Sequence, residues 1–252
     1  MARNRTAVIT GAGSKRGIGR AVAHHLARDG WNVAILDIAG DLAEDSAAEV
    51  AGAAGVQARG YAVDVTDVAS IKAAIERVTA DLPPVEGLVN IAGVSAPFKF
   101  LEITPQEWDR VFDINVKGTF LVTQAVLPLL LEQGRGRIVN MSSVTAVQGG
   151  GMFGGPHYSA SKAAVLGLTR ALARELAPTT ITVNAVAPGL TDTDITGGRL
   201  PQDRLDRIIA SVPLHRLATI DEVASAFAYL MSDDAAFITG TTVDINGGVH
   251  IN

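Results

Sequence analysis

The stretch that decides the fold of this 252-residue chain is TAVITGAGSKRGIG, residues 6–19. It begins with a short β-prone run, Thr6–Thr10, passes through a glycine-rich turn and leads into an amphipathic pattern over Gly19–Asp29. Glycines allow the backbone to turn tightly and to approach a pyrophosphate, and the exposed amides at the start of a helix favour its negative charge. A plain glycine-rich turn is the alternative for an isolated match, but the position directly after the first strand favours phosphate binding.

Short apolar runs and longer amphipathic stretches alternate along the rest of the chain. Several runs are nearly continuous in Val, Ile, Leu and Ala, which is typical of parallel strands covered on both faces. Repeated strand–helix–strand units predict an α/β sheet with helices on both faces, and no linker or break in composition divides the domain of residues 1–252. The predicted strands are Thr6–Thr10, Asn32–Asp37, Val56–Val63, Gly87–Ile91, Gly136–Met141, Ile181–Val186 and Thr241–Ile245. The predicted helices are Gly19–Asp29, Asp41–Ala53, Asp67–Ala80, Pro105–Leu131, Ser159–Ala177 and Ile220–Ser232.

Composition excludes several kinds of site. The chain has no cysteine, which rules out a disulfide framework, a thiolate nucleophile and a cysteine-ligated metal, and its five histidines show no metal-ligand spacing. A net charge of −5 without a basic block argues against a nucleic-acid partner. No signal peptide is recognisable, and the apolar stretch Phe120–Leu131 is shorter than the ~20 residues of a membrane span. We therefore expect a cytoplasmic protein with no metal site and no membrane or nucleic-acid partner.

Two groups of residues are candidates for chemistry. Asp37 closes the second predicted strand, where its carboxylate can accept hydrogen bonds from adenosine ribose hydroxyls or simply start a turn. Tyr158 and Lys162 stand four positions apart at the start of a predicted helix and so share one face. An ammonium beside a phenol lowers the phenol pKa from ~10, which makes Tyr158 a candidate proton donor or acceptor.

Four further polar residues are each open to two interpretations. Ser142 and Ser143 end the fifth predicted strand, where a hydroxyl either points into the same cleft or is a polar strand end. Asn115, within a long helical pattern, is either a surface amide or a helix-distorting group with a partner. His157, beside Tyr158, lines a substrate pocket or faces solvent.

Taken together, these features resemble the short-chain dehydrogenase/reductase family over essentially the whole chain. The order and spacing of the segments carry the resemblance, since no single segment is decisive. The matching segments are Thr10–Gly19, Asp64-Val65, Asn90-Ile91-Ala92-Gly93, Asn115, Asn140–Ser143, Tyr158–Lys162, Pro188-Gly189 with Thr193, and Asn246-Gly247-Gly248.

The resemblance implies a single Rossmann-type, doubly wound, mostly parallel seven-stranded sheet and a catalytic tetrad of Asn115, Ser143, Tyr158 and Lys162. By that resemblance Tyr158 exchanges the proton, Ser143 orients the substrate oxygen, Lys162 holds the nicotinamide ribose and lowers the tyrosine pKa, and Asn115 positions a water. It also implies a homotetramer, built through two long helices and the last strand. The cofactor-binding residues expected from the resemblance and from the features above are Gly11, Gly13, Arg16, Gly17, Ile18, Gly19, Asp37, Ile38, Asp64, Val65, Asn90, Ala92, Gly93, Tyr158, Lys162, Pro188, Gly189, Thr191 and Thr193.

The sequence departs from the family pattern in three places. Gly11 and Gly17 have five residues between them where the family usually has three, so either Gly13 is the functional first glycine or the loop carries an insertion. The usual Asn-Asn-Ala-Gly is Asn90-Ile91-Ala92-Gly93 here. Ser143 and Tyr158 are 15 positions apart against the usual 13, and the extra residues fall in the glycine-rich stretch 148–156, expected to form a wall of the substrate site.

The leading interpretation is an NAD-dependent oxidoreductase that interconverts a secondary alcohol and a ketone. An NADP-dependent 3-oxoacyl-carrier (acyl carrier protein) reductase is the close alternative. A non-catalytic dinucleotide-binding sensor is the alternative from another class, and the intact tetrad argues against it. The substrate loop, about 190–215, contains Arg199, Arg204 and Arg207, which leave an anionic substrate open.

The choice of cofactor depends on opposing charges. Lys15 and Arg16 could pair with the 2′-phosphate of NADP, whereas the Asp37 carboxylate would accept from the free 2′-hydroxyl of NAD and repel that phosphate. A long, solvated arginine can swing away while a strand-end aspartate is fixed. The sequence therefore favours NAD, with NADP as the other possibility.

Overall fold

The computed structural model describes residues 4–150, 154–193 and 202–251. Within them, seven strands form one sheet in the order β3-β2-β1-β4-β5-β6-β7, and every neighbouring pair is parallel. The predicted doubly wound α/β sheet is confirmed. The strands are β1 (Thr6–Thr10), β2 (Asn32–Asp37), β3 (Ala58–Ala62), β4 (Val85–Asn90), β5 (Gly136–Met141), β6 (Ile181–Pro188) and β7 (Thr242–Ile245).

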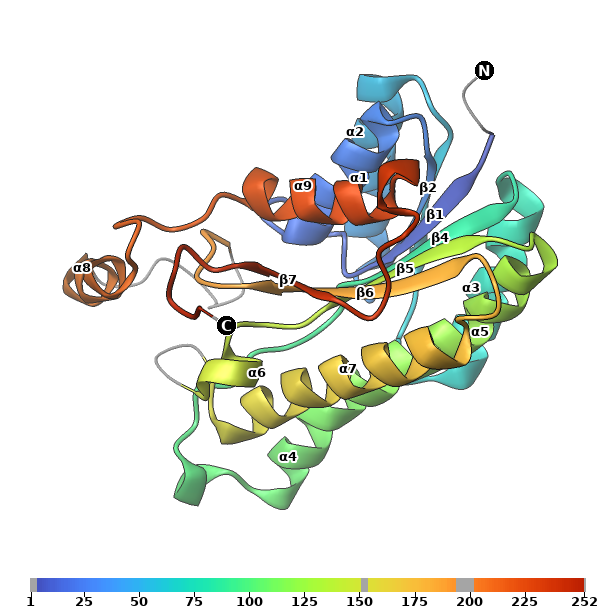
Figure 1. The fold of residues 1–252 in the computed structure, drawn as a ribbon. Helices are drawn as coiled ribbons and strands as arrows, with labels where there is room; N and C mark the ends of the chain where they lie inside the picture. Colours follow the sequence, from blue (N-terminus) through green and yellow to red (C-terminus); the bar gives the residue numbers. More distant parts are fainter. Residues whose placement is uncertain (1–3, 151–153, 194–201, 252) are drawn as a thin grey trace.

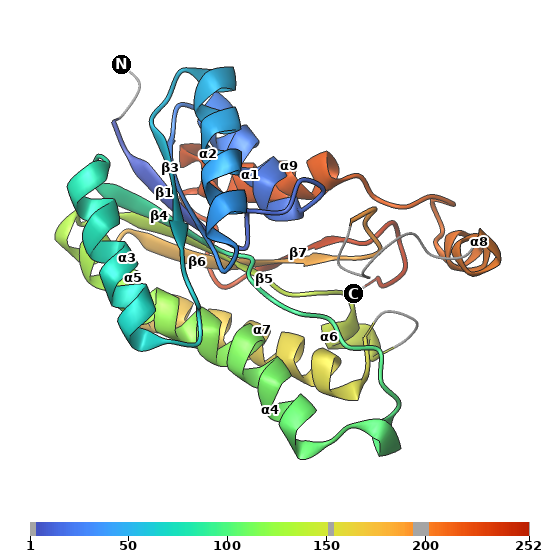
Figure 2. The same cartoon turned by 180° about the vertical axis from the view of Figure 1, so that it is seen from behind.

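Helices cover both faces of this sheet (Figures 1 and 2). On one face lie α1 (Ile18–Arg28), α2 (Gly40–Ala54) and α9 (Ile220–Met231). On the other lie α3 (Val68–Asp81), α5 (Gly118–Glu132) and α7 (Pro156–Glu175), with α4 (Pro105–Phe112) beside α7. The short helix α6 (Thr145–Gln148) follows β5, and α8 (Gln202–Ser211) stands apart from the layers, beyond one end of the sheet. Single turns are η1 (Phe100–Glu102) and η4 (Asp233–Ala235).

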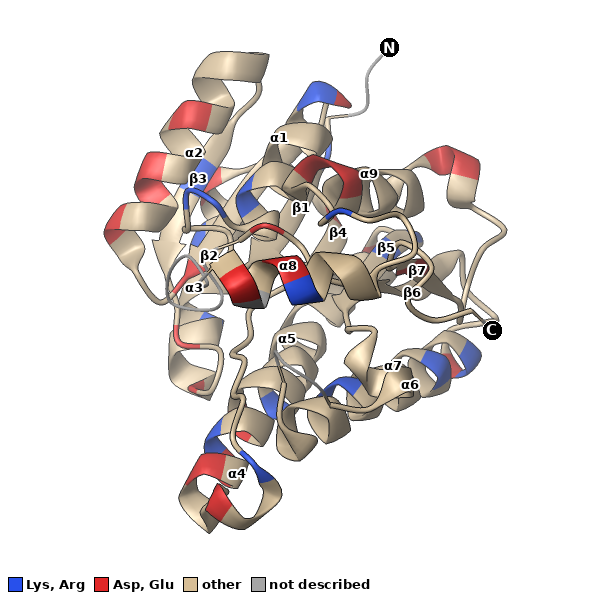
Figure 3. Cartoon of the chain, turned by 90° about the vertical axis from the view of Figure 1, so that its left-hand side faces the viewer, with Lys and Arg blue, Asp and Glu red and all other residues tan. Residues whose placement is uncertain are grey.

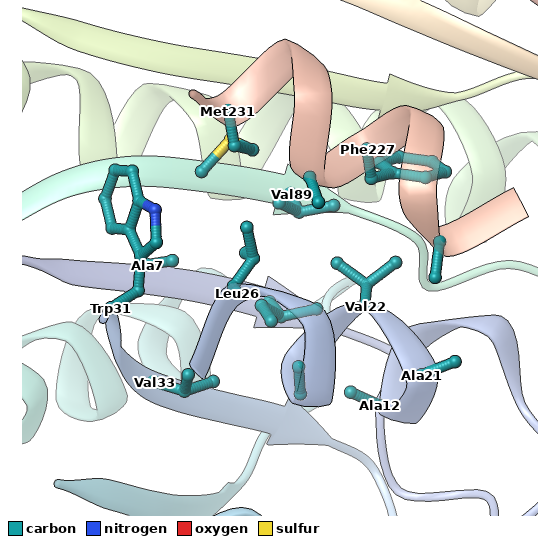
Figure 4. Close-up of a cluster of buried hydrophobic side chains, with 14 of the residues drawn as sticks. Ala7, Ala12, Ala21, Val22, Leu26, Trp31, Val33, Val89, Phe227 and Met231 are labelled. Carbon is teal, nitrogen blue, oxygen red and sulfur yellow. The ribbon is translucent and has the colours of Figure 1, made fainter. Parts of the chain in front are cut away.

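Side chains of β1 alternate between the two halves of the core. Ala7 and Ile9 join the cluster under α1 and α9, whereas Val8 joins the cluster under α3 and α5. Figure 4 shows the first cluster, in which Leu26 of α1 and Phe227 of α9 lie over the strands and Met231 of α9 lies near Trp31. Because both faces of the central strands are buried, the sequence shows continuous apolar runs there rather than alternation.

The direction in which successive strands are added to the sheet reverses at β1 and β4. After β1 the chain goes to β2 and β3 on one side, and β4 then pairs with β1 on the other side. The two crossovers leave opposite faces of the sheet, so a crevice opens beyond the carboxyl ends of these strands. The residues expected to bind a cofactor follow these ends.

The predicted helix Pro105–Leu131 is interrupted. A π-helical turn, η2 (Asp113–Lys117), separates α4 from α5, and Asn115 lies within it. From Pro105 to Glu132 the helical segment is long and apolar enough to cross a membrane, by length and composition alone, although Phe120–Leu131 by itself is not. Val126 and Leu130 are fully buried in the core under α3 and α5, which identifies α5 as a core helix of this fold.

Candidate active site

A cleft of about 830 Å³ lies beyond the carboxyl ends of the strands and brings most of the predicted site residues together. Its walls come from the loop after β1, the end of β2, the loops after β4, β5 and β6, the start of α7 and the inner face of α8. The predicted residues that line it are Gly11, Arg16, Gly17, Ile18, Asp37, Ala92, Gly93, Ser143, Tyr158, Lys162, Pro188, Gly189, Thr191 and Thr193.

In the glycine turn, the backbone lies very close to neighbouring backbone segments. Gly11 has φ +69°, and a Cβ added to it would lie 2.7 Å from the Ala92 backbone, so only glycine fits there. A Cβ on Gly19 would lie 2.3 Å from the Gly11 carbonyl oxygen, which brings the start of α1 against the turn. The N-cap residue Gly17 offers no side-chain hydrogen bond and the first turn of α1 has no acidic residue, so its amides are available to an anion.

These contacts decide between the two candidate first glycines. Gly11 has the left-handed backbone and lines the cleft, while the Gly13 amide donates to Asp37 Oδ2 at 2.8 Å. The loop therefore carries an insertion, and Gly11 keeps the role of the first glycine. Gly13 acts instead as a support for Asp37.

Asp37 is fixed at the carboxyl end of β2. Its Oδ2 accepts from the Gly13 amide and its Oδ1 accepts from the Ala39 amide at 3.1 Å. Both oxygens keep further lone pairs, and the residue lines the cleft. A carboxylate held in this way can accept ribose hydroxyls, which agrees with the function predicted for it.

Tyr158 and Lys162 lie in the first turns of α7, whose N1 position is Pro156. The Lys162 Nζ donates to the Met141 carbonyl at 3.0 Å and lies 5.9 Å from the centroid of the Tyr158 ring. Both side chains are buried, and burial lowers the pKa of Lys162 to about 8. Burial also raises the pKa of Tyr158, and a hydrogen bond with Ser143 only partly opposes it.

The expected lowering of the Tyr158 pKa by Lys162 is therefore not found in this structure. The desolvation of the phenolate outweighs the effect of its neighbours. Tyr158 is thus a neutral phenol at neutral pH, which makes it a proton donor rather than an acceptor in this state.

Ser143 is oriented by a residue that the sequence did not single out. The Thr145 amide and the Thr145 hydroxyl both donate to Ser143 Oγ, at 3.2 and 3.1 Å. With its lone pairs engaged, Ser143 is left to donate its own proton into the cleft. Ser142 has a different role, because its hydroxyl donates to the Lys162 carbonyl at 2.9 Å and ties β5 to α7.

Asn115 is the helix-distorting amide with a partner. It is fully buried in the π turn, and its Nδ2 donates to the Val94 carbonyl and to Ser161 Oγ, both at 3.0 Å. Its Oδ1 accepts from the Val94 amide at 2.8 Å, and Ser161 in turn donates to the Tyr158 carbonyl. Asn115 therefore joins the loop after β4 to the first turns of α7, from a position behind the cleft wall.

Several predicted residues are not among those that line this cleft. The Asn90 side chain is buried, and its Nδ2 donates to Asn140 Oδ1 at 2.9 Å and to Thr123 Oγ1 at 3.0 Å. Asp64 accepts from the amide and hydroxyl of Thr66, which lowers its pKa. Ile38 is 76% exposed.

Two other positions also differ from expectation. Val65 packs on Gly118 of α5, at a distance of 2.8 Å from the Cβ that Gly118 lacks. His157 is neither a pocket residue nor solvent-facing, since it is fully buried with its Nε2 3.8 Å from Glu107 Oε1.

The substrate end of the cleft was largely missed by sequence reasoning. Apolar side chains from distant segments line it, namely Val94, Val144, Leu190, Leu205, Ile208 and Leu217. Leu205 and Ile208 lie on α8, inside the region predicted as a variable loop, and their spacing of three was a helical signal in the sequence. Of the three arginines in that loop, Arg207 pairs with Asp203 at 2.9 Å, while Arg199 and the Arg204 side chain lie outside what the structure describes, as do residues 151–153 of the glycine-rich stretch.

Comparison with known proteins identifies the family. A family model described as enoyl-(acyl carrier protein) reductase matches residues 11–250. A short-chain type dehydrogenase/reductase of Sinorhizobium fredii is 43% identical over 252 residues, covering 100% of both chains. The 3-oxoacyl-[acyl-carrier-protein] reductase of Escherichia coli is 38% identical over 245 residues, covering 97% of each chain.

Solved structures agree with this result. A 3-oxoacyl-[acyl-carrier protein] reductase of Brucella melitensis superposes with a TM-score of 0.91 at 35% identity, covering 100% of this chain and 93% of that one. Another such reductase from that organism, solved with bound NAD, gives a TM-score of 0.89 at 35% identity, over 99% and 92% of the two chains. The chain belongs to the short-chain dehydrogenase/reductase family and is an oxidoreductase.

The pKa of Lys162 leads to a prediction about pH. Because its charged form is lost as pH rises through about 8, while the raised pKa keeps Tyr158 neutral, kcat/KM for ketone reduction should fall above pH 8. Lys162→Arg, whose guanidinium stays charged, should remove this decrease even if it lowers the rate. The measurement is kcat/KM between pH 6 and 10, with the exposed Lys72→Arg as control; an unchanged profile in Lys162→Arg would refute the assignment.

Proposed function

We propose that this chain is an NAD-dependent oxidoreductase that interconverts a secondary alcohol and a ketone, with Tyr158 as the proton donor and acceptor. The observation that carries the proposal is the buried pair of Tyr158 and Lys162 beside Ser143, in a cleft that also holds the fixed carboxylate of Asp37. The turn around Gly11 and the uncapped start of α1 fit a dinucleotide, since they leave backbone amides and space where a pyrophosphate would lie.

The chemistry divides between the cofactor and the chain. A bound nicotinamide would supply or accept the hydride at the reacting carbon. In reduction, Ser143 donates a hydrogen bond to the carbonyl oxygen, and Tyr158 transfers its proton to that oxygen as the alcohol forms. The resulting phenolate is stabilised by the Lys162 ammonium close to its ring, because an opposite charge at ~4–6 Å favours the charged form. In oxidation the same groups act in the opposite order.

Electrostatics support NAD as the cofactor. Arg16 is paired with Asp192 at 2.7 Å, and Lys15 lies 3.8 Å from Asp45, so the two cations of the glycine turn already face carboxylates. Asp37 adds a negative charge where the adenosine ribose would lie. A 2′-phosphate placed there would meet this carboxylate at short range, and two unit charges ~4 Å apart repel by ~4 kcal/mol at an effective dielectric constant of ~20.

The second candidate is an NADP-dependent reductase of 3-oxoacyl groups on acyl carrier protein. It is favoured by the names of the relatives that are 38% and 35% identical. The apolar walls from Leu190, Leu205 and Ile208 would also suit an acyl chain. A non-catalytic sensor has less support, because the polar groups of the tetrad are together and individually oriented.

We also propose that the protein is a cytoplasmic homotetramer. The support is the family and the apolar side chains exposed on α5, where Phe120 and Leu131 are 44% and 47% exposed.

Replacing Tyr158 by Phe tests the proposed chemistry. The variant loses the hydroxyl that exchanges the proton, so turnover should fall by at least the ~10²–10⁴ typical of general acid–base catalysis, while NADH affinity changes little. Steady-state kinetics and a fluorescence titration with NADH measure the two quantities. Tyr229→Phe, on an exposed side chain of α9, serves as the control; near-normal turnover of Tyr158→Phe would remove the tetrad as the catalytic centre.

Replacing Asp37 by Ala tests the cofactor. The loss of a charged hydrogen-bond acceptor for ribose, worth ~1.5–3 kcal/mol, should weaken NADH binding about tenfold or more and improve the use of NADPH. The comparison is kcat/KM and Kd with each cofactor for the wild type, Asp37→Ala and the control Asp41→Ala at the start of α2. A wild type that prefers NADPH tenfold or more would contradict the NAD proposal.

Comparing substrates separates the two candidate functions. Figure 3 shows the face that carries α8, where, among the described residues, acidic and basic positions lie side by side along the ribbon rather than in a run of one sign. We therefore expect small ketones to reach a kcat/KM at least equal to that of a 3-oxoacyl group on acyl carrier protein. The decisive assay compares a small ketone, a 3-oxoacyl pantetheine thioester and the carrier-bound form. A tenfold preference for the carrier-bound form would establish the second candidate.

A further inference from the structure

An ion pair crosses the cleft at its nucleotide end. Arg16 belongs to the glycine turn after β1, and Asp192 follows β6, 176 positions further along the chain. The Arg16 guanidinium donates to Asp192 Oδ1 at 2.7 Å, and both residues line the cleft. The Arg16–Asp192 contact therefore joins two walls of the cleft, the glycine turn and the segment after β6.

Asp192 occupies a fixed position. Thr191 forms a parallel bridge with Ala218, the Asp192 amide donates to the Ala218 carbonyl at 3.1 Å, and the Ala218 amide donates to the Leu190 carbonyl at 2.9 Å. The backbone that carries the carboxylate is thus paired with Ala218 by two hydrogen bonds, in the manner of a short parallel strand. Arg16 is the long and flexible partner, and Asp192 is a carboxylate that holds its guanidinium.

This arrangement bears on Arg16, one of the two cations that could favour NADP. Arg16 stands three residues after Gly13, whose amide holds Asp37, so its side chain is within the same turn as the expected adenosine site. We propose that Asp192 is a specificity-determining residue, which draws Arg16 across the cleft and withholds it from a 2′-phosphate. This inference rests on the proposed use of NAD. Two carboxylates then act together: Asp37 repels the phosphate, and Asp192 occupies the arginine that would attract it.

The exposure of the Arg16–Asp192 pair limits how far it can change the cofactor preference. The side chains of Arg16 and Asp192 are 41% and 69% exposed, so solvent screens their attraction. Exposed ion pairs of this kind shift equilibria by a factor of about two to five. Asp192 should therefore adjust cofactor preference by that factor, whereas Asp37 contributes the larger part.

The test is a double-mutant cycle on binding rather than on turnover. Dissociation constants for NADH and NADPH are measured by fluorescence titration for the wild type, Asp192→Asn, Arg16→Ala and the double variant. Asparagine keeps the size of the side chain and leaves the backbone bonds to Ala218 in place. Asp192→Asn should raise the affinity for NADPH relative to NADH about twofold to fivefold, because the freed arginine can meet the 2′-phosphate.

The Arg16→Ala background distinguishes this explanation from a simple loss of negative charge. If Asp192 acts by holding Arg16, Asp192→Asn should change the NADPH-to-NADH ratio little when Arg16 is absent. A ratio that stays constant in Asp192→Asn, or that shifts equally with and without Arg16, overturns the inference. Asp203→Asn, which removes an exposed carboxylate paired with Arg207 on α8, is the matched control and should leave the ratio unchanged.

Failure of this inference differs from failure of the proposed function. A wild type that binds NADPH more tightly than NADH contradicts the NAD proposal whatever the variants do. A wild type that prefers NADH, with a ratio that Asp192→Asn does not move, contradicts only the role given to Asp192.

Discussion

An all-parallel sheet is the constraint on which the rest of this structure depends. Parallel neighbours cannot be joined by tight hairpins, so each strand is followed by a crossover, and all the strands end at the same edge. The glycine turn, Asp37, the loop after β4, Ser143 and the segment from Pro188 all follow strand ends and therefore meet there. Groups up to about 180 positions apart in sequence come together without any long loop crossing the sheet.

Within that frame, buried hydrogen bonds between side chains and backbone set the positions of the catalytic groups. Asn115 joins Val94 to Ser161, Ser142 holds the Lys162 carbonyl, and the Lys162 ammonium rests on the Met141 carbonyl. Each of these bonds ties α7 to β5 or to the loop after β4, so the first turns of α7 are fixed relative to the strand ends. Burial of the same groups shifts their pKa values, raising that of Tyr158 and lowering that of Lys162. Rigidity and altered acidity thus have one physical origin, the exclusion of water around α7.

The sequence predicted the strands to within a few residues, because long apolar runs bounded by polar or glycine residues locate buried strands well. Most of the residues that line the cleft could be predicted because they come directly after those strands in the sequence. The buried position of the Asn90 side chain could also be predicted, because Leu88 faces the core under α3 and α5 and a residue two positions further on a strand faces the same way. The meeting of Arg16 with Asp192, and the apolar wall from α8, depend on tertiary packing between distant segments, for which a local pattern holds no signal.

The π turn at Asp113–Lys117 sets a limit on how this chain can change during evolution. In a regular helix each residue advances by about 100°, and a π turn accommodates one residue more than an α turn does. Deleting one residue there could restore a continuous α-helix while rotating Asn115 away from Val94 and Ser161. The apolar positions of α5 can drift among similar side chains, but the number of residues between Pro105 and Gly118 cannot. An insertion or deletion in the π turn thus displaces Asn115, whereas substitutions among similar apolar side chains of α5 leave it in place.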